Sequence, residues 1–195
     1  MRVLSGVLVL ILLPGSPALA QGQGWGVKGG VNFATQSSDQ PDEVSLGYRI
    51  GIVAGGFYTW PLGERFAFQP EVLYSQQGSA VEELGVKAKT KIDYLLVPVL
   101  ARYRVSRSVF VVGGPSMGFK LRAKASAEFG GSSSEVDIGD FVEDFDFGLA
   151  AGGGMEFGRY TVEGRYTFGL SNINAEGDVE KIKNRVISVL GGVRF

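Results

Sequence analysis

The sequence contains neither histidine nor cysteine, the two side chains most used in nucleophilic catalysis and transition-metal binding. Ser-His and Cys-His pairs and thiolate metal sites are therefore excluded. Residues 24–29, GWGVKG, have the spacing of a dinucleotide-binding loop. That loop functions only between a strand and a helix, and the surrounding sequence predicts no such arrangement. We therefore expect no enzymatic activity, no cofactor and no metal site.

Two carboxylates remain as candidates for acid or cation chemistry. Asp144 and Asp146 are two positions apart in a predicted strand, so both lie on one face of it. This arrangement suits paired acids or a cation site, but carboxylates on the inner face of a barrel more often pair with arginine and lysine. The acids between the predicted strands lack the spacing of a calcium-binding loop. We interpret Asp144 and Asp146 as ion-pair partners and the loop acids as solvated charges.

Charged residues alternate with apolar residues along the chain, so they gather on one face of each predicted strand. In a closed barrel that face points into the lumen. The predicted lumen charge network contains Lys28, Arg49, Glu71, Arg102, Lys120, Arg122, Asp144, Asp146, Glu163 and Arg165. Buried charges must be paired, and a barrel of about eight strands has room only for its own side chains. We predict a filled, ion-paired lumen whose excess of basic groups implies hydrated ends or a bound anion.

Eight runs with a period of two residues position these charges. They cover residues 24–34, 48–60, 65–75, 94–104, 109–122, 144–157, 159–170 and 184–195. The connections after the second, fourth and sixth runs are short turns, whereas those after the first, third, fifth and seventh are much longer. Transmembrane barrels typically have short periplasmic turns and long outer loops. The pattern predicts an all-β protein: a single antiparallel up-and-down transmembrane β-barrel of about eight strands, with both termini in the periplasm.

Aromatic residues on the apolar faces fall into two groups. Near the short turns lie Trp25, Trp60, Phe66, Tyr103, Phe157, Tyr160 and Phe195. Near the long connections lie Phe33, Tyr48, Tyr74, Phe119, Phe145 and Phe168. Aromatic rings favour the two interfaces of a bilayer, and aliphatic side chains favour its centre. We therefore predict two aromatic girdles around a wall that faces lipid.

The first twenty residues have the three parts of a secretory signal. A basic residue precedes an apolar run over residues 3–13, and the small-residue site Ala-Leu-Ala follows at residues 18–20. The apolar run is too short to span a membrane as a helix. We predict that residues 1–20 are a cleaved signal peptide and that residues 21–195 form the outer-membrane barrel domain. The net charge of −1 argues against a nucleic-acid partner.

Three segments provide a family resemblance: residues 29–33 (GGVNF), 69–75 (QPEVLYS) and 94–100 (YLLVPVL). They resemble recurring segments of the PorT-like, porin-family outer-membrane β-barrel domain, a small OmpA-like eight-stranded barrel. The resemblance extends over the mature chain. It implies export to the outer membrane of a Gram-negative-type bacterium, and it indicates architecture better than activity.

The last run ends the chain on an aromatic residue inside a strand. An apolar terminal strand needs a partner, and the first strand is the best candidate. Val193 and Phe195 fit the C-terminal assembly signal of outer-membrane barrels, although Leu190 stands where glycine is usual. The resemblance implies that the outer-membrane assembly machinery recognises this strand.

We expect a monomeric, lipid-embedded protein without enzymatic activity, whose barrel anchors long extracellular loops for envelope integrity, adhesion or surface binding. One alternative is a narrow porin-like channel with a weak anion preference, because the inner face is rich in bases. A second alternative is a soluble periplasmic barrel that holds a ligand. That barrel would have to turn its apolar faces inward and expose its arginines and lysines. The sequence predicts no particular ligand or loop partner.

Overall fold

The computed structural model describes residues 23–38, 47–83, 86–129, 132–175 and 182–195. Its elements are β1 (Gly24–Ser38), β2 (Gly47–Pro61), β3 (Phe66–Glu83), β4 (Val86–Arg104), β5 (Val109–Phe129), β6 (Ser132–Asp137), the 3-10 helix η1 (Gly139–Phe141), β7 (Phe145–Phe157), β8 (Tyr160–Gly169) and β9 (Ile182–Arg194). The predicted signal peptide, residues 1–20, lies outside the described residues. No helix within the described ranges is long and apolar enough to cross a membrane.

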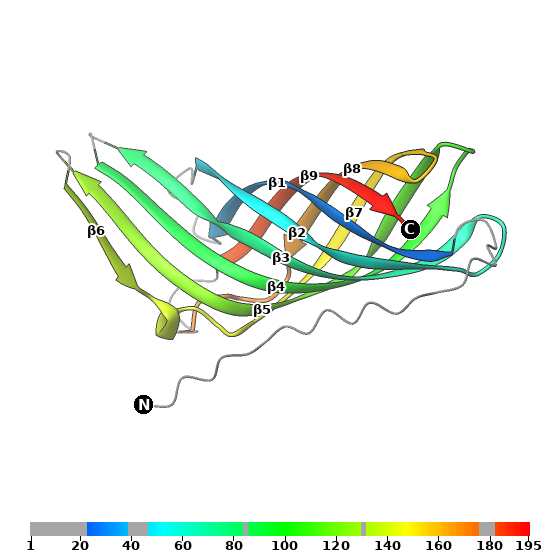
Figure 1. Ribbon diagram of the computed structural model, residues 1–195. Coiled ribbons are helices and arrows are strands. Elements are labelled where there is room, and N and C mark those ends of the chain that lie inside the picture. The colour runs from blue at the N-terminus through cyan, green and yellow to red at the C-terminus, as the bar shows by residue number, and fades with distance from the viewer. Residues whose placement is uncertain (1–22, 39–46, 84–85, 130–131, 176–181) are drawn as a thin grey trace, which may run out of the picture.

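Eight of the nine described strands form a closed antiparallel barrel. The sheet order is β4-β3-β2-β1-β9-β8-β7-β5-β6, and an additional pairing of β4 with β5 closes the ring. On one edge of β5, β7 pairs with residues 109–119 and β6 pairs with residues 124–129. Figure 1 shows the short turns, the start of β1 and the C-terminus at one end, called here the short-turn end. The long β3–β4 and β5–β6 hairpins define the opposite, hairpin end. The predicted all-β barrel of about eight strands is confirmed.

The first and last strands close the barrel together. Strand β1 pairs with β2 on one edge and with β9 on the other. At the short-turn end, the amide of Phe195 donates a hydrogen bond to the carbonyl oxygen of Trp25 at 2.9 Å. The expected pairing of the terminal strand with the first strand is therefore confirmed.

Apolar side chains cover the outside of the barrel and polar side chains fill the inside. On the outer face, Ile50 is 68% exposed and Val72 is 53% exposed. On the inner face, Gln69 and Glu71 are 0% and 1% exposed. Soluble proteins show the reverse distribution, whereas a transmembrane barrel needs an apolar outer band.

Glycines on the inner face allow the strands to approach closely. A Cβ added to Gly30 would lie 1.9 Å from the carbonyl oxygen of Val189. A Cβ added to Gly55 would lie 2.0 Å from the carbonyl oxygen of Val72. A side chain at either position would force backbone apart, so the narrow lumen depends on these glycines.

Two of the connections predicted as long loops are largely strands. Strand β3 extends to Glu83 before β4 begins at Val86, and β5 extends to Phe129 before β6 returns beside it. The long connection predicted after the fifth run therefore contains β6 and η1. The extensions of β4 and β5 still alternate, as VKAKTKID over residues 86–93 and AKASAEF over residues 123–129, but they set charged and polar residues against mostly small apolar ones and lack the run of large apolar side chains of a lipid-facing band. A prediction that follows only the lipid-facing apolar band ends the strands too early.

A register shift between β4 and β5 changes which side chains face outward. Asp93 pairs with Arg122, but the next residue of β4 pairs with Lys120. Leu121 is therefore an inserted residue, as in a β-bulge. Beyond it the alternation is inverted, so Arg122 is exposed and Ala123 is buried. The prediction that Arg122 faces the lumen is wrong, because one inserted residue reverses the two faces of a strand.

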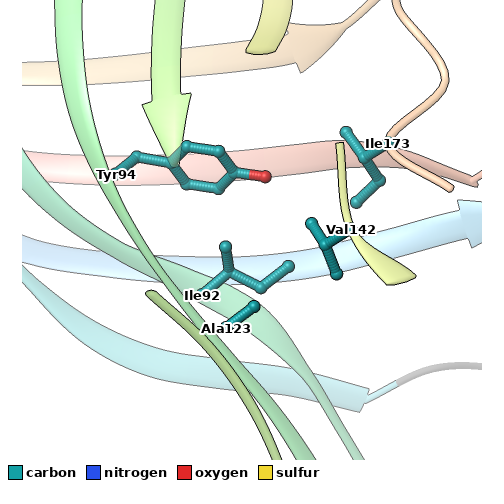
Figure 2. Close-up of a cluster of buried hydrophobic side chains, with 5 residues drawn as sticks. All are labelled: Ile92, Tyr94, Ala123, Val142 and Ile173. Atoms are coloured by element: carbon teal, nitrogen blue, oxygen red, sulfur yellow. The ribbon is translucent and has the colours of Figure 1, made fainter. Parts of the chain in front are cut away.

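A cluster of buried apolar side chains lies inside the barrel toward the hairpin end. This apolar cap contains Ile92, Tyr94, Ala123, Val142 and Ile173 (Figure 2). Three of these residues lie on β4 and β5, whereas Val142 follows η1 and Ile173 follows β8. The amide of Glu143 donates a hydrogen bond to the carbonyl oxygen of Ile173 at 2.9 Å. The connections before β7 and after β8 thus fold together over the end of the lumen.

Candidate functional site: the charged lumen

Four ionic side chains from β1, β3 and β8 meet inside the barrel. Lys28 Nζ lies 2.8 Å from Glu71 and 3.0 Å from Glu163. The Arg165 guanidinium donates to both carboxylate oxygens of Glu71, at 2.8 and 3.0 Å, and to Glu163 at 2.7 Å. These side chains are 0–4% exposed. Two cations and two carboxylates therefore form a neutral, fully paired group, called here the central cluster.

The lumen becomes more positive on the short-turn side of the central cluster. Arg102 of β4 and Arg194 of β9 both form ion pairs with Glu156 of β7. The Arg102 guanidinium stacks on Phe110, 3.6 Å from the ring centroid, and donates to Gln69 Oε1 at 3.2 Å. The Gln69 amide in turn donates to the central cluster at 2.7 Å. Here two cations share one carboxylate.

On the hairpin side of the central cluster, neutral groups surround the buried carboxylate of Asp146. Asp146 is 8% exposed and accepts hydrogen bonds from the Asn184 amide at 2.8 Å and the Ser171 hydroxyl at 2.9 Å. Asn184 also donates to the Tyr94 hydroxyl at 3.3 Å, which links this group to the apolar cap. Asp146 faces inward as predicted, but an amide and a hydroxyl stand where an arginine or lysine was expected.

Lys120 contacts the segment from η1 to the start of β7, which contributes Val142 to the apolar cap. Its ammonium lies 2.8 Å from Asp144, whose side chain is 91% exposed. It also donates to the carbonyl oxygens of Gly139 and Val142. Lys120 and Asp144 form the predicted type of ion pair, but Asp144 lies at the hydrated end and not inside the lumen.

The structure divides the ten residues of the predicted network into three groups. The first group is joined directly or through Gln69 and contains Lys28, Glu71, Arg102, Glu163 and Arg165. At the hairpin end lie Lys120, Asp144 and Asp146. Arg49 is half-buried and donates to the Gln77 carbonyl oxygen, whereas Arg122 is on the outer face.

Neutral polar residues complete the lumen and are missed by a prediction that considers charge alone. Asn32, which is 1% exposed, donates to the Ser75 hydroxyl at 2.9 Å and accepts from the Ser188 hydroxyl at 2.7 Å. These three residues connect β1, β3 and β9. Their inward positions follow from the same period of two residues, and this signal locates them. Within the described part of the chain, no group of three or more acidic residues could hold a metal ion.

The residues of the predicted aromatic girdles lie on the outer surface, where each is exposed or half-buried. Ring pairs join neighbouring strands: Trp25 with Phe195 at 4.6 Å, Phe66 with Tyr103 at 4.8 Å, and Phe119 with Phe145 at 5.6 Å between centroids. The first two pairs lie at the short-turn end and the third lies toward the hairpin end. Their position at lipid interfaces stays a prediction.

Residues 19–175 match the family described as the outer membrane protein beta-barrel domain. The match covers more than half of the chain, so the protein belongs to this family. It is an integral β-barrel of the outer membrane, and the predicted location is confirmed. The soluble periplasmic alternative is wrong, because a soluble barrel would carry its apolar faces inside, whereas here they lie on the outside.

Two solved structures show the extent of the structural similarity. Neisserial surface protein A (NspA) is 17% identical with a TM-score of 0.57, and the alignment covers 90% of this chain and 100% of that chain. Ail, the attachment invasion locus protein of Yersinia pestis, is 16% identical with a TM-score of 0.48, over 90% of this chain and 99% of that chain. The comparison with curated protein sequences gives no match. At this level of identity the similarity to NspA supports the barrel fold alone.

Proposed function

We propose that the protein is a non-enzymatic membrane anchor that displays the β3–β4 and β5–β6 hairpins outside the cell for surface binding or adhesion. The observation that supports this function is the length of the strands. Strands β4 and β5 contain 19 and 21 residues, whereas about 9–11 residues suffice to cross a bilayer. Roughly ten residues of each strand therefore extend beyond the lipid as ordered sheet.

The side chains of the hairpins suit an aqueous environment. Lys91 of β4 and Lys124 of β5 lie 3.2 and 2.5 Å from Glu135 of β6. Hydrogen bonds from Lys124 and Lys91 lower the pKa of the Glu135 carboxyl below its ordinary value, so this group is ionised at neutral pH. The three charges connect neighbouring strands on the outer face. We infer that the hairpin end is extracellular and that the short-turn end is periplasmic.

The filled lumen supports an anchor more than a channel. A water path would have to pass the fully paired central cluster and the apolar cap. Both are built from buried side chains, and an eight-stranded barrel has little further space. The narrow-channel alternative has no comparable observation in its favour.

Processing and assembly belong to the same proposal. We propose that residues 1–20 are removed on export and that the chain is a monomer of the PorT-like type, on the basis of the three segments described above. The assembly machinery would recognise the terminal strand through Val193 and Phe195. Strand β9 and β1 form a complete seam, which fits closure by the terminal strand.

Epitope insertion tests the orientation. A tag inserted between Glu83 and Val86, which pair at the end of the β3–β4 ladder, should be labelled by antibody on intact cells. The same tag between Gly158 and Arg159, in the β7–β8 turn, is the matched control and should be labelled only after the outer membrane is opened. Labelling of the turn tag on intact cells would contradict the proposal.

Shortening the hairpin tests the surface role. Replacing residues 80–89 with an Asn-Gly turn should leave an inserted barrel, since this segment lies beyond the lipid. Cells with the shortened hairpin should attach less to epithelial monolayers and abiotic surfaces than cells with the full protein at equal expression. Equal attachment, together with equal resistance of the envelope to detergent, would contradict a surface role for this hairpin.

A further inference from the structure

The short-turn end of the lumen contains a cavity of about 230 Å³ whose lining is rich in arginine. Arg65, Arg102, Arg104 and Arg194 all contribute to its wall. They come from three places in the fold. Arg102 and Arg104 are two positions apart on β4, Arg194 ends β9, and Arg65 closes the β2–β3 turn. A backbone hydrogen bond of 2.7 Å from the Arg104 amide to the Arg65 carbonyl oxygen holds two of them side by side.

The cations of this mouth exceed the carboxylates that pair with them. Glu156 is shared by Arg102 and Arg194. Among the described residues, no ion pair involves Arg65 or Arg104. Arg65 has a long hydrogen bond of 3.4 Å to a tyrosine hydroxyl, and Arg104 has one of 3.4 Å to the backbone oxygen of Glu64. With the Glu64 side chain counted, the four guanidinium groups face two side-chain carboxylates.

The rest of the lumen cannot neutralise this excess. The central cluster is already balanced, because Glu71 and Glu163 are fully used by Lys28 and Arg165. Arg102 stacks on Phe110 and pairs with Glu156, so the inner wall of the cavity is formed by a buried guanidinium that already has partners. The outer wall consists of Arg65 and Arg104, which are exposed to water.

Buried and exposed guanidinium groups around one cavity suit an oxyanion. Each guanidinium presents planar pairs of N–H donors that match two oxygens of a phosphate or carboxylate. An excess of two positive charges matches a phosphate group better than a single carboxylate. The wall residues Thr59 and Arg102 are buried and belong to the inward faces of their strands, so the cavity reaches into the interior of the barrel.

We propose that the short-turn mouth of the barrel binds a phosphate group, held by Arg65 and Arg104 against Arg102 and Arg194. The phosphate belongs either to a soluble compound or to a phospholipid headgroup that bends over the rim. This site is separate from the hairpins, so it does not depend on the surface role proposed above.

Calorimetric titration of the refolded barrel in maltoside detergent tests the site, with pyrophosphate as the probe and ionic strength held constant by sodium chloride. The parent protein should bind one pyrophosphate per barrel. The double variant Arg65→Gln/Arg104→Gln should bind at least tenfold more weakly. Arg65 and Arg104 lie outside the buried network, so this variant should fold, as checked by the heat-dependent gel mobility of the barrel.

A second double variant provides the matched control. Arg107 and Arg159 are exposed at the same end of the barrel but do not line the cavity. The variant Arg107→Gln/Arg159→Gln removes the same charge and should bind pyrophosphate like the parent. Equal weakening of both double variants would show a diffuse field without a site, and it would overturn the proposal. Absence of saturable binding by the parent would overturn it as well.

Titration in nanodiscs of phosphatidylglycerol identifies the source of the phosphate. If a lipid headgroup fills the mouth, pyrophosphate binding seen in detergent should disappear in these nanodiscs. If a soluble compound is the ligand, binding should persist in both environments. Either result supports the phosphate site, provided that binding in detergent depends on Arg65 and Arg104.

Discussion

Glu71 illustrates, at the scale of single residues, how strongly the lumen depends on complete pairing. Its carboxylate lies 2.8 Å from both Lys28 and Arg165, and its side chain is 0% exposed. A buried ion pair is weak evidence for net stability, because both ions lose their water. Removing one partner is a different matter, since it leaves the other charge buried and uncompensated. The central cluster should therefore tolerate single changes poorly.

Replacing Glu71 with glutamine should lower the free energy of unfolding by about 3–5 kcal/mol, because two buried cations then share a single carboxylate. Urea titration of the refolded barrel, followed by tryptophan fluorescence, measures this change. Glu135→Gln is the control, because Glu135 also pairs with two lysines but lies exposed on the hairpin. We expect no measurable change there. Equal destabilisation by the two variants would show that burial is not the cause.

The outward-facing wall can be tested with a charge placed between the two predicted girdles. Leu149 faces outward on β7 and lies between Phe145 and Phe157, one residue from each predicted girdle. Leu149→Arg should cost about 2–4 kcal/mol of folding free energy in lipid, because the charge enters the hydrocarbon. Met155→Arg, beside the girdle on the same strand, should cost only about 0–1 kcal/mol. Folding yields and urea midpoints in bilayers measure both. A Leu149→Arg variant as stable as the parent would mean that the faces are inverted.

Individual placements were predictable where the strand pattern was unbroken. Lys28, Glu71, Glu163 and Arg165 alternate with apolar neighbours, and one face of such a strand must turn from lipid. Which of these residues pair with one another depends on how the strands are aligned in the closed barrel, and no local sequence pattern specifies that alignment. The predicted inward position of Arg122 is wrong because the bulge at Leu121 reverses the two faces of the strand beyond it.

At the scale of elements, the sequence predicts the membrane-spanning part of each strand better than its ends. Lipid imposes alternation on residues inside the bilayer, so a period of two appears there. In the hairpin parts of β4 and β5 the period of two persists, but charged and polar residues alternate there with mostly small apolar ones, so no lipid-facing apolar band marks these extensions. Strand β6 is held by pairing with β5 and by Glu135, which are tertiary contacts. The apolar cap likewise joins residues from distant connections.

The terminal strand carries a prediction about assembly. Phe195 closes the seam through its hydrogen bond to Trp25 and through ring contact at 4.6 Å. Deleting Phe195 should slow membrane insertion far more than deleting residues 21–22, which follow the proposed cleavage site. Pulse-chase measurement of the folded, heat-modifiable form in cells compares the two rates. Equal rates would remove the special role proposed for this residue.

At the scale of the whole molecule, the alternation of short and long connections predicted the barrel and the number of its strands. The reason is that a bilayer separates two kinds of turn, and an antiparallel chain must visit each side in order. The sequence does not predict the uneven charge along the lumen. A neutral centre and a basic short-turn mouth arise only when Glu71, Glu163 and Glu156 are assigned to particular cations by the closed geometry.

The filled lumen decides the function of the whole molecule, because it distinguishes an anchor from a channel. The central cluster and the apolar cap are built from buried side chains inside the barrel, and we expect them to close the path between its two ends. The variant Glu163→Gln/Arg165→Gln should destabilise the barrel before it opens a path, since both residues are buried in the cluster.

Planar-bilayer recording of the purified, refolded protein measures directly whether the lumen conducts ions. The parent protein should show no steady unitary current at either polarity, under conditions where a known porin reconstituted in parallel conducts. Stable, anion-selective unitary currents from the parent protein, reduced when Arg49 and Arg102 are replaced, would contradict the filled lumen and establish the channel.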